Sequence, residues 1–164
     1  MHEMTVAHLG VDRNTESPVV ILREKDGSRV LPIWIGPAEA SAIAMELQGV
    51  KAARPMTHDL LKQVIVGLGG ELRRIVISAV RENTYFAELL IQREDHVFQV
   101  DARPSDSIAL ALRLNAPIFA SDQLLEQSGV EADDSAAGSG SREAERLREY
   151  LEKLDPEDFG KFNP

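Results

Sequence analysis

The feature of this sequence that most constrains its fold is a strand-like segment that runs through charged residues directly into a helix. The segment is Val97–Phe119, VFQVDARPSDSIALALRLNAPIF, in which Phe98 and Val100 alternate with polar residues as in a half-buried strand. Pro104 and the polar residues beside it are typical of a helix start, and apolar residues at helical spacing continue to Leu114. An Asn and a Pro then end the predicted helix.

Four polar residues lie at this junction: Asp101, Arg103, Ser105 and Asp106. A strand that turns into a helix start is expected to place them at one edge of the sheet. The free N–H groups and the positive end of the helix dipole favour a phosphate there. Asp101 and Asp106, two carboxylates close in sequence, favour a hard divalent cation, Mg²⁺ or Mn²⁺.

A purely structural interpretation accounts for the same residues. Ser105 can cap the helix, Asp106 can offset the helix dipole, and Arg103 can pair with Asp101. The residue pattern alone leaves both interpretations open.

The remaining patterns predict an α+β fold, a mainly antiparallel mixed sheet packed with about three helices, plus a C-terminal helical appendage. Period-two alternation predicts a first strand at 4–12, and apolar runs predict a hairpin around the turn at 25–28. Alternation returns from Leu72 to Asp101, which predicts an antiparallel meander. The segment GPAEASAIAMELQG predicts a helix whose alanines pack closely against the sheet or against a second copy of the chain.

A second group of polar residues lies in KAARPMTHD, where Lys51, Arg54, His58 and Asp59 precede or begin a helix. The basic residues are candidates for phosphate contacts, and His58 is a candidate general base or metal ligand. A capped, solvated turn is the structural alternative. Glu39, in the alanine-rich helix, is a further candidate carboxylate. The helix after Asp59 is expected to bury the apolar residues Leu60, Leu61, Val64, Ile65 and Leu68.

Composition divides the chain into a core domain at 1–130, a flexible acidic Gly/Ser linker at 131–141 and an amphipathic helical tail at 142–164. The formal charge is −9, and residues 131–164, with ten acids and five bases, contribute −5 of it. This charge argues against a protein that coats nucleic acid through bulk electrostatics, whereas a site lined by a few basic residues stays compatible with it. The apolar stripe of the tail is suited to docking on its own domain, on a protein partner or on another copy.

The absence of cysteine excludes disulfides and thiolate metal sites. A basic leader followed by an apolar stretch is absent from the start, MHEMTVAHLG, and no apolar run is long enough to span a bilayer. The expected location is the cytoplasm, with no membrane partner.

Three segments, LPIWIGPAEASAIAMELQG, RPMTHDLL and VDARPSDSIALALRLNAPIF, together resemble the bifunctional nuclease family, a bacterial and plant domain long catalogued as of unknown function. The resemblance covers residues 1 to about 130. The tail segment LREYLEKLDPEDFGKF is distantly similar to the UvrB/UvrC interaction motif. The residues of this chain that match the family motifs are Gly36, Pro37, Glu39, Arg54, Pro55, His58, Asp59, Asp101, Arg103, Ser105 and Asp106.

The resemblance implies a self-associating α+β domain with nuclease activity on RNA and DNA. For a metal-assisted reaction, the chemistry of a divalent ion held by carboxylates assigns Asp101 and Asp106 as catalytic metal ligands and Glu39 or His58 as ligand or general base. Phosphate binding would fall to Arg103 and Arg54, with Ser105 and Lys51 as further substrate contacts.

The alternative function is a non-catalytic regulatory or scaffold protein that binds a partner protein or nucleic acid. We also expect a homo-oligomer, most simply a two-fold dimer.

Overall fold

The computed structural model describes residues 1–131. Within this range the chain forms one eight-stranded sheet in the order β6-β5-β4-β7-β1-β2-β3-β8. Neighbouring strands are antiparallel except β4 and β7, which are parallel. The strands are β1 His2–Val11, β2 Pro18–Glu24, β3 Arg29–Trp34, β4 Glu71–Arg81, β5 Thr84–Arg93, β6 His96–Ala102, β7 Ile118–Ala120 and β8 Val130–Glu131.

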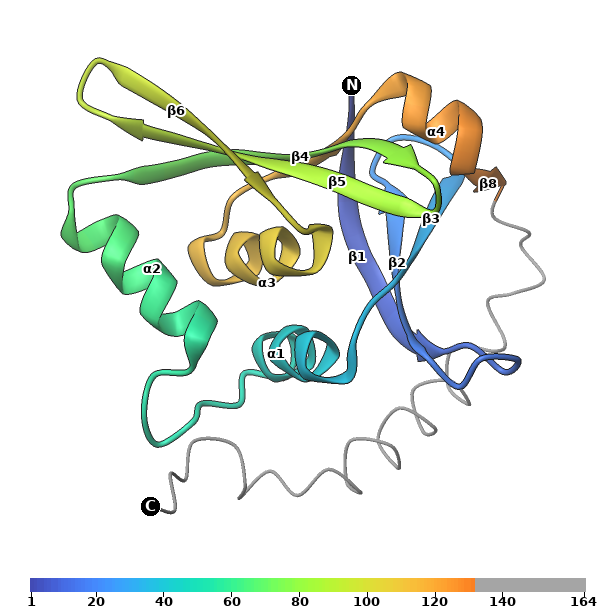
Figure 1. Ribbon diagram of the computed structural model, residues 1–164, viewed down its shortest axis with the longest axis horizontal. Helices are drawn as coiled ribbons and strands as arrows, with labels where there is room; N and C mark the ends of the chain where they lie inside the picture. The colour runs from blue at the N-terminus through green and yellow to red at the C-terminus, as the bar shows by residue number, and fades with distance from the viewer. Residues whose placement is uncertain (132–164) are drawn as a thin grey trace.

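Four helices accompany the sheet in the described part of the chain. α3 lies between α1 and α2, and these three helices cover one side of the sheet, whereas α4 packs on β3 and β4 away from them (Figure 1). The α+β prediction is therefore confirmed. The helices are α1 Pro37–Leu47, α2 Thr57–Gly67, α3 Pro104–Leu114 and α4 Asp122–Ser128.

The core lies between α3, α1 and the sheet. Ile108 and Leu110 of α3 are fully buried, and the small side chains Ala40, Ala42 and Ala44 of α1 are buried too. The predicted close packing of these alanines within the chain is confirmed, since α1 lies against α3 and β2, and packing on a second copy stays a prediction. This packing holds the first turns of α1 and α3 near each other.

The predicted linker and tail, 131–141 and 142–164, lie outside the described residues except for Glu131. Glu131 ends β8 and pairs with Arg29 of β3, so the sheet includes the first residue of the predicted linker. Among residues 1–131, no helix combines the length and the hydropathy needed to cross a bilayer.

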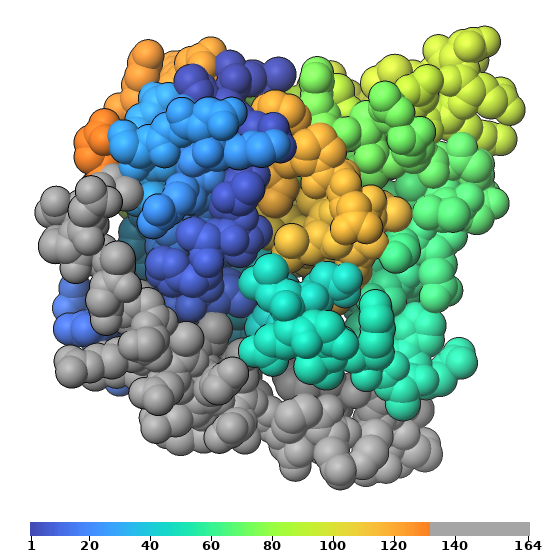
Figure 2. Space-filling view, turned by 180° about the vertical axis from the view of Figure 1, so that it is seen from behind, coloured from blue at the N-terminus to red at the C-terminus, as the bar shows by residue number. Residues whose placement is uncertain are grey.

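The prediction for the apolar residues of α2 is wrong in most positions. Only Ile65 is buried, whereas Leu60, Leu61, Val64 and Leu68 are exposed. The edge strand β6 is also exposed along almost its whole length. Its hairpin with β5 projects from the body of the molecule (Figure 2). The exposed apolar residues of β6 are Val97 at 63%, Phe98 at 49% and Val100 at 40%.

We propose that β6 pairs with β6 of a second copy in a two-fold dimer. An exposed apolar edge strand offers unpaired backbone groups, and antiparallel pairing about a two-fold axis would satisfy them on both copies. Light scattering should give a dimer mass at micromolar concentrations, and Phe98→Lys should shift it toward the monomer. A monomer mass for the wild-type chain over this range would contradict the proposal.

Candidate active site

The start of α3 carries a tightly paired arginine and aspartate. β6 ends at Ala102, Arg103 follows in extended conformation as the N-cap, and Pro104 fits the first helical position because it needs no N–H partner. Arg103 Nε donates to Asp106 Oδ2 at 2.6 Å, and its Nη2 donates to Asp106 Oδ1 at 3.1 Å. Two parallel hydrogen bonds of this kind fix the orientation of both groups.

Two residues from other helices complete a connected cluster. His58 of α2 places Nε2 2.9 Å from Asp106 Oδ1, and Glu39 of α1 places Oε1 2.9 Å from Arg103 Nη1. His58 is mostly buried, with 12% of its side chain exposed, whereas Arg103 is 66% exposed. We call Glu39, His58, Arg103 and Asp106 the four-residue cluster. Four of the predicted site residues are thus brought together from three separate helices.

The cluster lies where three helices begin. Glu39 is the third residue of α1, His58 is the second of α2, and Asp106 is the third of α3, with Arg103 directly before it. Each helix start presents unpaired N–H groups and the positive end of its dipole. Their convergence favours an anion at this position, in agreement with the phosphate interpretation of the sequence.

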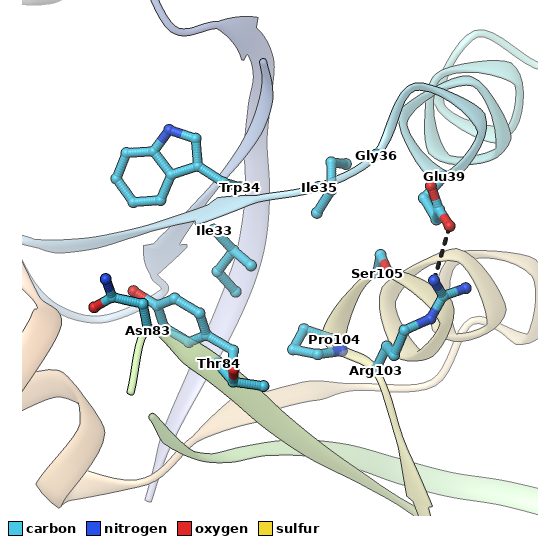
Figure 3. A pocket seen from close by; sticks show the side chains of 11 residues that line it. Ile33, Trp34, Ile35, Gly36, Glu39, Asn83, Thr84, Arg103, Pro104 and Ser105 are labelled. Carbon is cyan, nitrogen blue, oxygen red and sulfur yellow. Dashed lines mark ion pairs between the residues drawn. The ribbon is translucent and has the colours of Figure 1, made fainter. Parts of the chain in front are cut away.

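Two cavities adjoin the cluster, and Glu39 and Arg103 line both of them. The smaller, of about 210 Å³, also contains His58 and Asp106 and is walled by Ala38 and other residues at the starts of α1 and α2. The larger, of about 280 Å³, extends between the end of β3 and the β4–β5 turn (Figure 3). The Glu39–Arg103 ion pair therefore has ligand-sized space on two sides.

Ser105 does not cap α3, because the N-cap is Arg103 and no side-chain cap bond is present. Its side chain lines the larger cavity and is 6% exposed. Its hydroxyl makes no hydrogen bond to another residue in 1–131. Because the hydroxyl lines the cavity, a ligand atom there would find both a donor and an acceptor.

The electrostatics of the cluster keep Asp106 ionised. Burial acts to raise the pKa of the Asp106 carboxyl, but hydrogen bonds from Arg103 and His58 outweigh it and hold the pKa below its ordinary value. The same contact raises the pKa of Arg103, with Glu39 adding to the effect. Arg103 therefore bridges the carboxylates of Glu39 and Asp106. The structural interpretation, which paired Arg103 with Asp101, is wrong on this contact.

A buried arginine that the sequence analysis did not single out links the three helices that carry the cluster. Arg113 of α3 donates Nε to Asp59 Oδ1 at 2.8 Å and Nη2 to the carbonyl of Ala42 at 3.0 Å. Asp59 in turn accepts the Met56 N–H at 3.0 Å and closes the first turn of α2. Arg113 thus ties α1 and α2 to α3 and fixes the turn that carries His58.

The other predicted site residues lie outside the cluster. Asp101 is exposed on β6 opposite Glu88, and its side chain makes no hydrogen bond or ion pair to any residue in 1–131. Arg54 is exposed in the connection before α2. Lys51 is 79% exposed and lies 4.0 Å from Glu46. A role for Arg54 and Lys51 in substrate contacts remote from the cluster stays a prediction.

The side chains of the cluster do not meet the needs of a divalent cation. Carboxylate oxygens are suitable ligands for Mg²⁺ or Mn²⁺, but both oxygens of Asp106 are taken by Arg103 and His58. Within residues 1–131 no three His, Asp or Glu side chains are grouped to hold a metal ion. The cluster thus does not fit a metal ion without rearrangement of Asp106, and the metal requirement stays a prediction.

Gly36 leaves space for the carboxylate of Glu39. Its backbone angles suit any residue, but a Cβ at this position would collide with Glu39 Oε2. Because Glu39 has a flexible side chain, we expect Gly36→Ala to fold with near wild-type stability while displacing the carboxylate from Arg103. Thermal unfolding and cleavage rates should separate these effects. A variant with unchanged rates would show that the Glu39–Arg103 contact is not needed.

Comparisons with known proteins identify the family of this chain. The bifunctional nuclease domain model matches residues 20–133. An uncharacterized protein of Mycobacterium tuberculosis is 42% identical in an alignment of 164 residues. The alignment covers 97% of this chain and 98% of that protein. Bifunctional nuclease 2 of Oryza sativa subsp. japonica is 28% identical over 130 residues, covering 77% of this chain and 40% of that protein. Bifunctional nuclease 1 of Arabidopsis thaliana is 26% identical over 122 residues, with coverage of 72% and 38%. The chain belongs to the bifunctional nuclease domain family.

Proposed function

We propose that the chain hydrolyses phosphodiester bonds of RNA, DNA or both at the four-residue cluster. The observation that carries the proposal is the contact between His58 and Asp106, placed beside Arg103 at three converging helix starts. This combines a proton acceptor with groups that bind a phosphate. The names of the plant relatives support the same reaction class, although the chain spans less than half of their length.

Substrate binding would use Arg103 and the N–H groups at the starts of the three helices. Arg103 is exposed enough to reach a phosphate, and its guanidinium remains charged at every working pH. A phosphate oxygen would compete with Glu39 for Arg103 Nη1, since that ion pair lies between the two cavities. The negative charge that develops on the phosphate during attack would be stabilised by the same donors.

Proton transfer would be the role of His58. With Nε2 protonated, the imidazole donates to Asp106 and leaves Nδ1 to accept a proton from water. As the water oxygen bonds to phosphorus and the bond to the leaving oxygen breaks, the imidazolium would be stabilised by the ionised Asp106. Return of the proton to the leaving oxygen or to solvent would complete the cycle.

Incubation of purified chain with labelled single-stranded RNA and DNA tests the proposal. Each substrate is assayed with Mg²⁺, with Mn²⁺ and with chelator, so the predicted metal requirement is tested in the same experiment. We expect cleavage products that increase with enzyme concentration. Absence of products in all conditions from a folded chain would contradict the proposed reaction.

A scaffold role is the second candidate, and the exposed apolar residues of α2 favour it. Leu60 and Val64 lie four residues apart on one face of this helix, and Leu68 follows at the same spacing as its C-cap. Such a face can bind a protein partner. The scaffold role predicts no cleavage and no effect of cluster substitutions on partner binding, because α2 presents its apolar residues independently of Arg103 and Asp106.

A further inference from the structure

We propose that the larger cavity is a ribose subsite, in which the 2′-hydroxyl of an RNA nucleotide hydrogen-bonds Glu39 and Ser105. The inference rests on the proposed function and deepens it, because it names RNA as the preferred substrate of a site whose phosphate is held at Arg103. Its basis is a pair of side-chain oxygen atoms on the wall of this cavity that have no hydrogen-bond partner within residues 1–131.

The first of these atoms is Oε2 of Glu39. Oε1 of the same carboxylate lies 2.9 Å from Arg103 Nη1, whereas Oε2 makes no hydrogen bond to any residue in 1–131. Oε2 is the oxygen nearer to Gly36, since a Cβ built on Gly36 would collide with it. Gly36 lines the larger cavity but not the smaller one. The free carboxylate oxygen therefore lies on the side of the larger cavity, where it can accept a hydrogen bond.

The second atom is the hydroxyl oxygen of Ser105. The residue is 6% exposed, and its hydroxyl has no partner in the described part of the chain. Among residues 1–131, Arg74 Nε is the only side-chain nitrogen or oxygen that is both inaccessible and without a partner. The Ser105 oxygen is therefore accessible from the cavity that the residue lines, and it can both donate and accept.

Together the two atoms match a hydroxyl group of a ligand. Figure 3 shows Glu39 and Ser105 next to Arg103 on one side of the cavity. A ligand hydroxyl can donate to Glu39 Oε2 and accept from the Ser105 hydroxyl at the same time. A second phosphate is a poorer match, because Glu39 adds a negative charge to the wall. In nucleic acid the group with both properties is the 2′-hydroxyl of ribose, which DNA lacks.

Arg103 sets the position of the sugar, because it lines both cavities. Asp106 and Glu39 use its Nε and one N–H of each terminal nitrogen, which leaves a second N–H on each for a phosphate oxygen. In RNA the 2′-hydroxyl is on the carbon next to the one that carries the 3′-phosphate. A phosphate at Arg103 therefore places the 2′-hydroxyl of the nucleotide on its 5′ side within reach of the larger cavity.

The size and charge of the site agree with recognition of a sugar. The cavity volume of about 280 Å³ is near the lower end for ligand pockets, roughly 300 Å³, and suits a single sugar better than a larger ligand. The formal charge of −9 opposes RNA and DNA alike, because both carry the same phosphates. Selectivity must therefore come from a group that only one of them has, and a hydrogen bond to a charged side chain provides roughly tenfold or more in affinity.

Binding of probes that resist cleavage tests the subsite. We would prepare labelled single-stranded oligonucleotides of one sequence with phosphorothioate linkages, as RNA, as DNA and as 2′-O-methyl RNA. The methylated probe keeps the sugar pucker of RNA but has no 2′ proton to donate to Glu39. In fluorescence anisotropy the full chain should bind RNA at least about tenfold more tightly than either other probe. Equal affinity for RNA and DNA, equal affinity for RNA and the methylated probe, or no binding of any probe would overturn the inference.

A substitution locates the discriminating contact. Ser105→Ala should bind RNA several-fold more weakly and DNA with unchanged affinity, so the preference for RNA should fall. The matched control is Ser41→Ala, because Ser41 is buried to a similar degree at 5% exposed, donates its hydroxyl to the Pro37 carbonyl and lines neither cavity. This control should keep the wild-type preference. A folded Ser105→Ala chain that also keeps it would overturn the subsite, and the methylated probe decides the question on the wild-type chain if the variant does not fold.

The outcome is distinguishable from failure of the proposed function. Tighter binding of RNA than of the other two probes, without cleavage of ordinary RNA or DNA, would keep the subsite and remove the nuclease. Cleavage of RNA and DNA with equal KM, and equal binding of all three probes, would keep the nuclease and remove the subsite.

Discussion

Replacing His58 with glutamine is expected to lower the rate of phosphodiester cleavage roughly 100- to 10,000-fold, the usual contribution of a general base. Glutamine can still donate to Asp106, so the contact between α2 and α3 is kept while the proton acceptor is lost. Cleavage rates and thermal unfolding of the same preparation measure the two effects separately. The melting temperature should change little.

The matched control is His96→Gln. His96 is exposed on β6, where it pairs with Arg93, and it does not line either cavity beside the cluster. Its replacement should leave the rate unchanged. A folded His58→Gln chain that cleaves as fast as wild type would remove His58 from the mechanism and leave its bond to Asp106 a structural contact.

Arg113→Met is expected to give the largest loss of stability, about 3 kcal/mol, because it leaves an uncompensated carboxylate and two carbonyls in a mostly buried site. For a chain of this size this corresponds to a fall in Tm of roughly 10 °C. Calorimetry checks the expected value. The matched control is Arg73→Met, since Arg73 is 53% exposed and its loss should cost less than about 0.5 kcal/mol.

The pH dependence of this effect has a definite sign. Burial acts to raise the pKa of Asp59, but the hydrogen bonds from Arg113 and the Met56 N–H hold it below its ordinary value. A carboxyl with a lowered pKa stabilises the fold above its unfolded pKa of about 3.9, and this contribution is lost as the pH falls through the folded pKa. The difference in stability between wild type and Arg113→Met should therefore be constant near neutral pH and shrink below about pH 4. A difference that grows on acidification would contradict the Asp59–Arg113 account.

Local sequence patterns predicted the junction of β6 and α3 because strand alternation, proline and helix periodicity all occur within one segment. The convergence of Glu39, His58 and Asp106 was not predictable in the same way, because it depends on how α1 and α2 pack on α3. The sequence placed these residues near helix starts, and the packing brought the helix starts together. Arg103 bridging Glu39 and Asp106 is a consequence of that tertiary contact.

Two features were missed for identifiable reasons. Arg113 lies on an otherwise apolar helix, where an arginine is usually solvated, and its partners come from α1 and α2. Arg113 could have been identified from its position, because helical spacing places it on the same face of α3 as the apolar residues of the core. Apolar spacing in α2 predicted burial, but that spacing does not distinguish a face in the core from a face on the surface.

The central claim is that cleavage takes place at the four-residue cluster, and the most direct test compares Asp106→Asn with Asp101→Asn in one cleavage assay. Both changes remove one negative charge from a similar shape, but only Asp106 contacts His58 and Arg103. We predict that Asp106→Asn loses most of the cleavage rate and that Asp101→Asn retains it, with both chains folded. Equal loss in both variants would favour the carboxylate pair as a metal site, and wild-type rates in Asp106→Asn would contradict the claim.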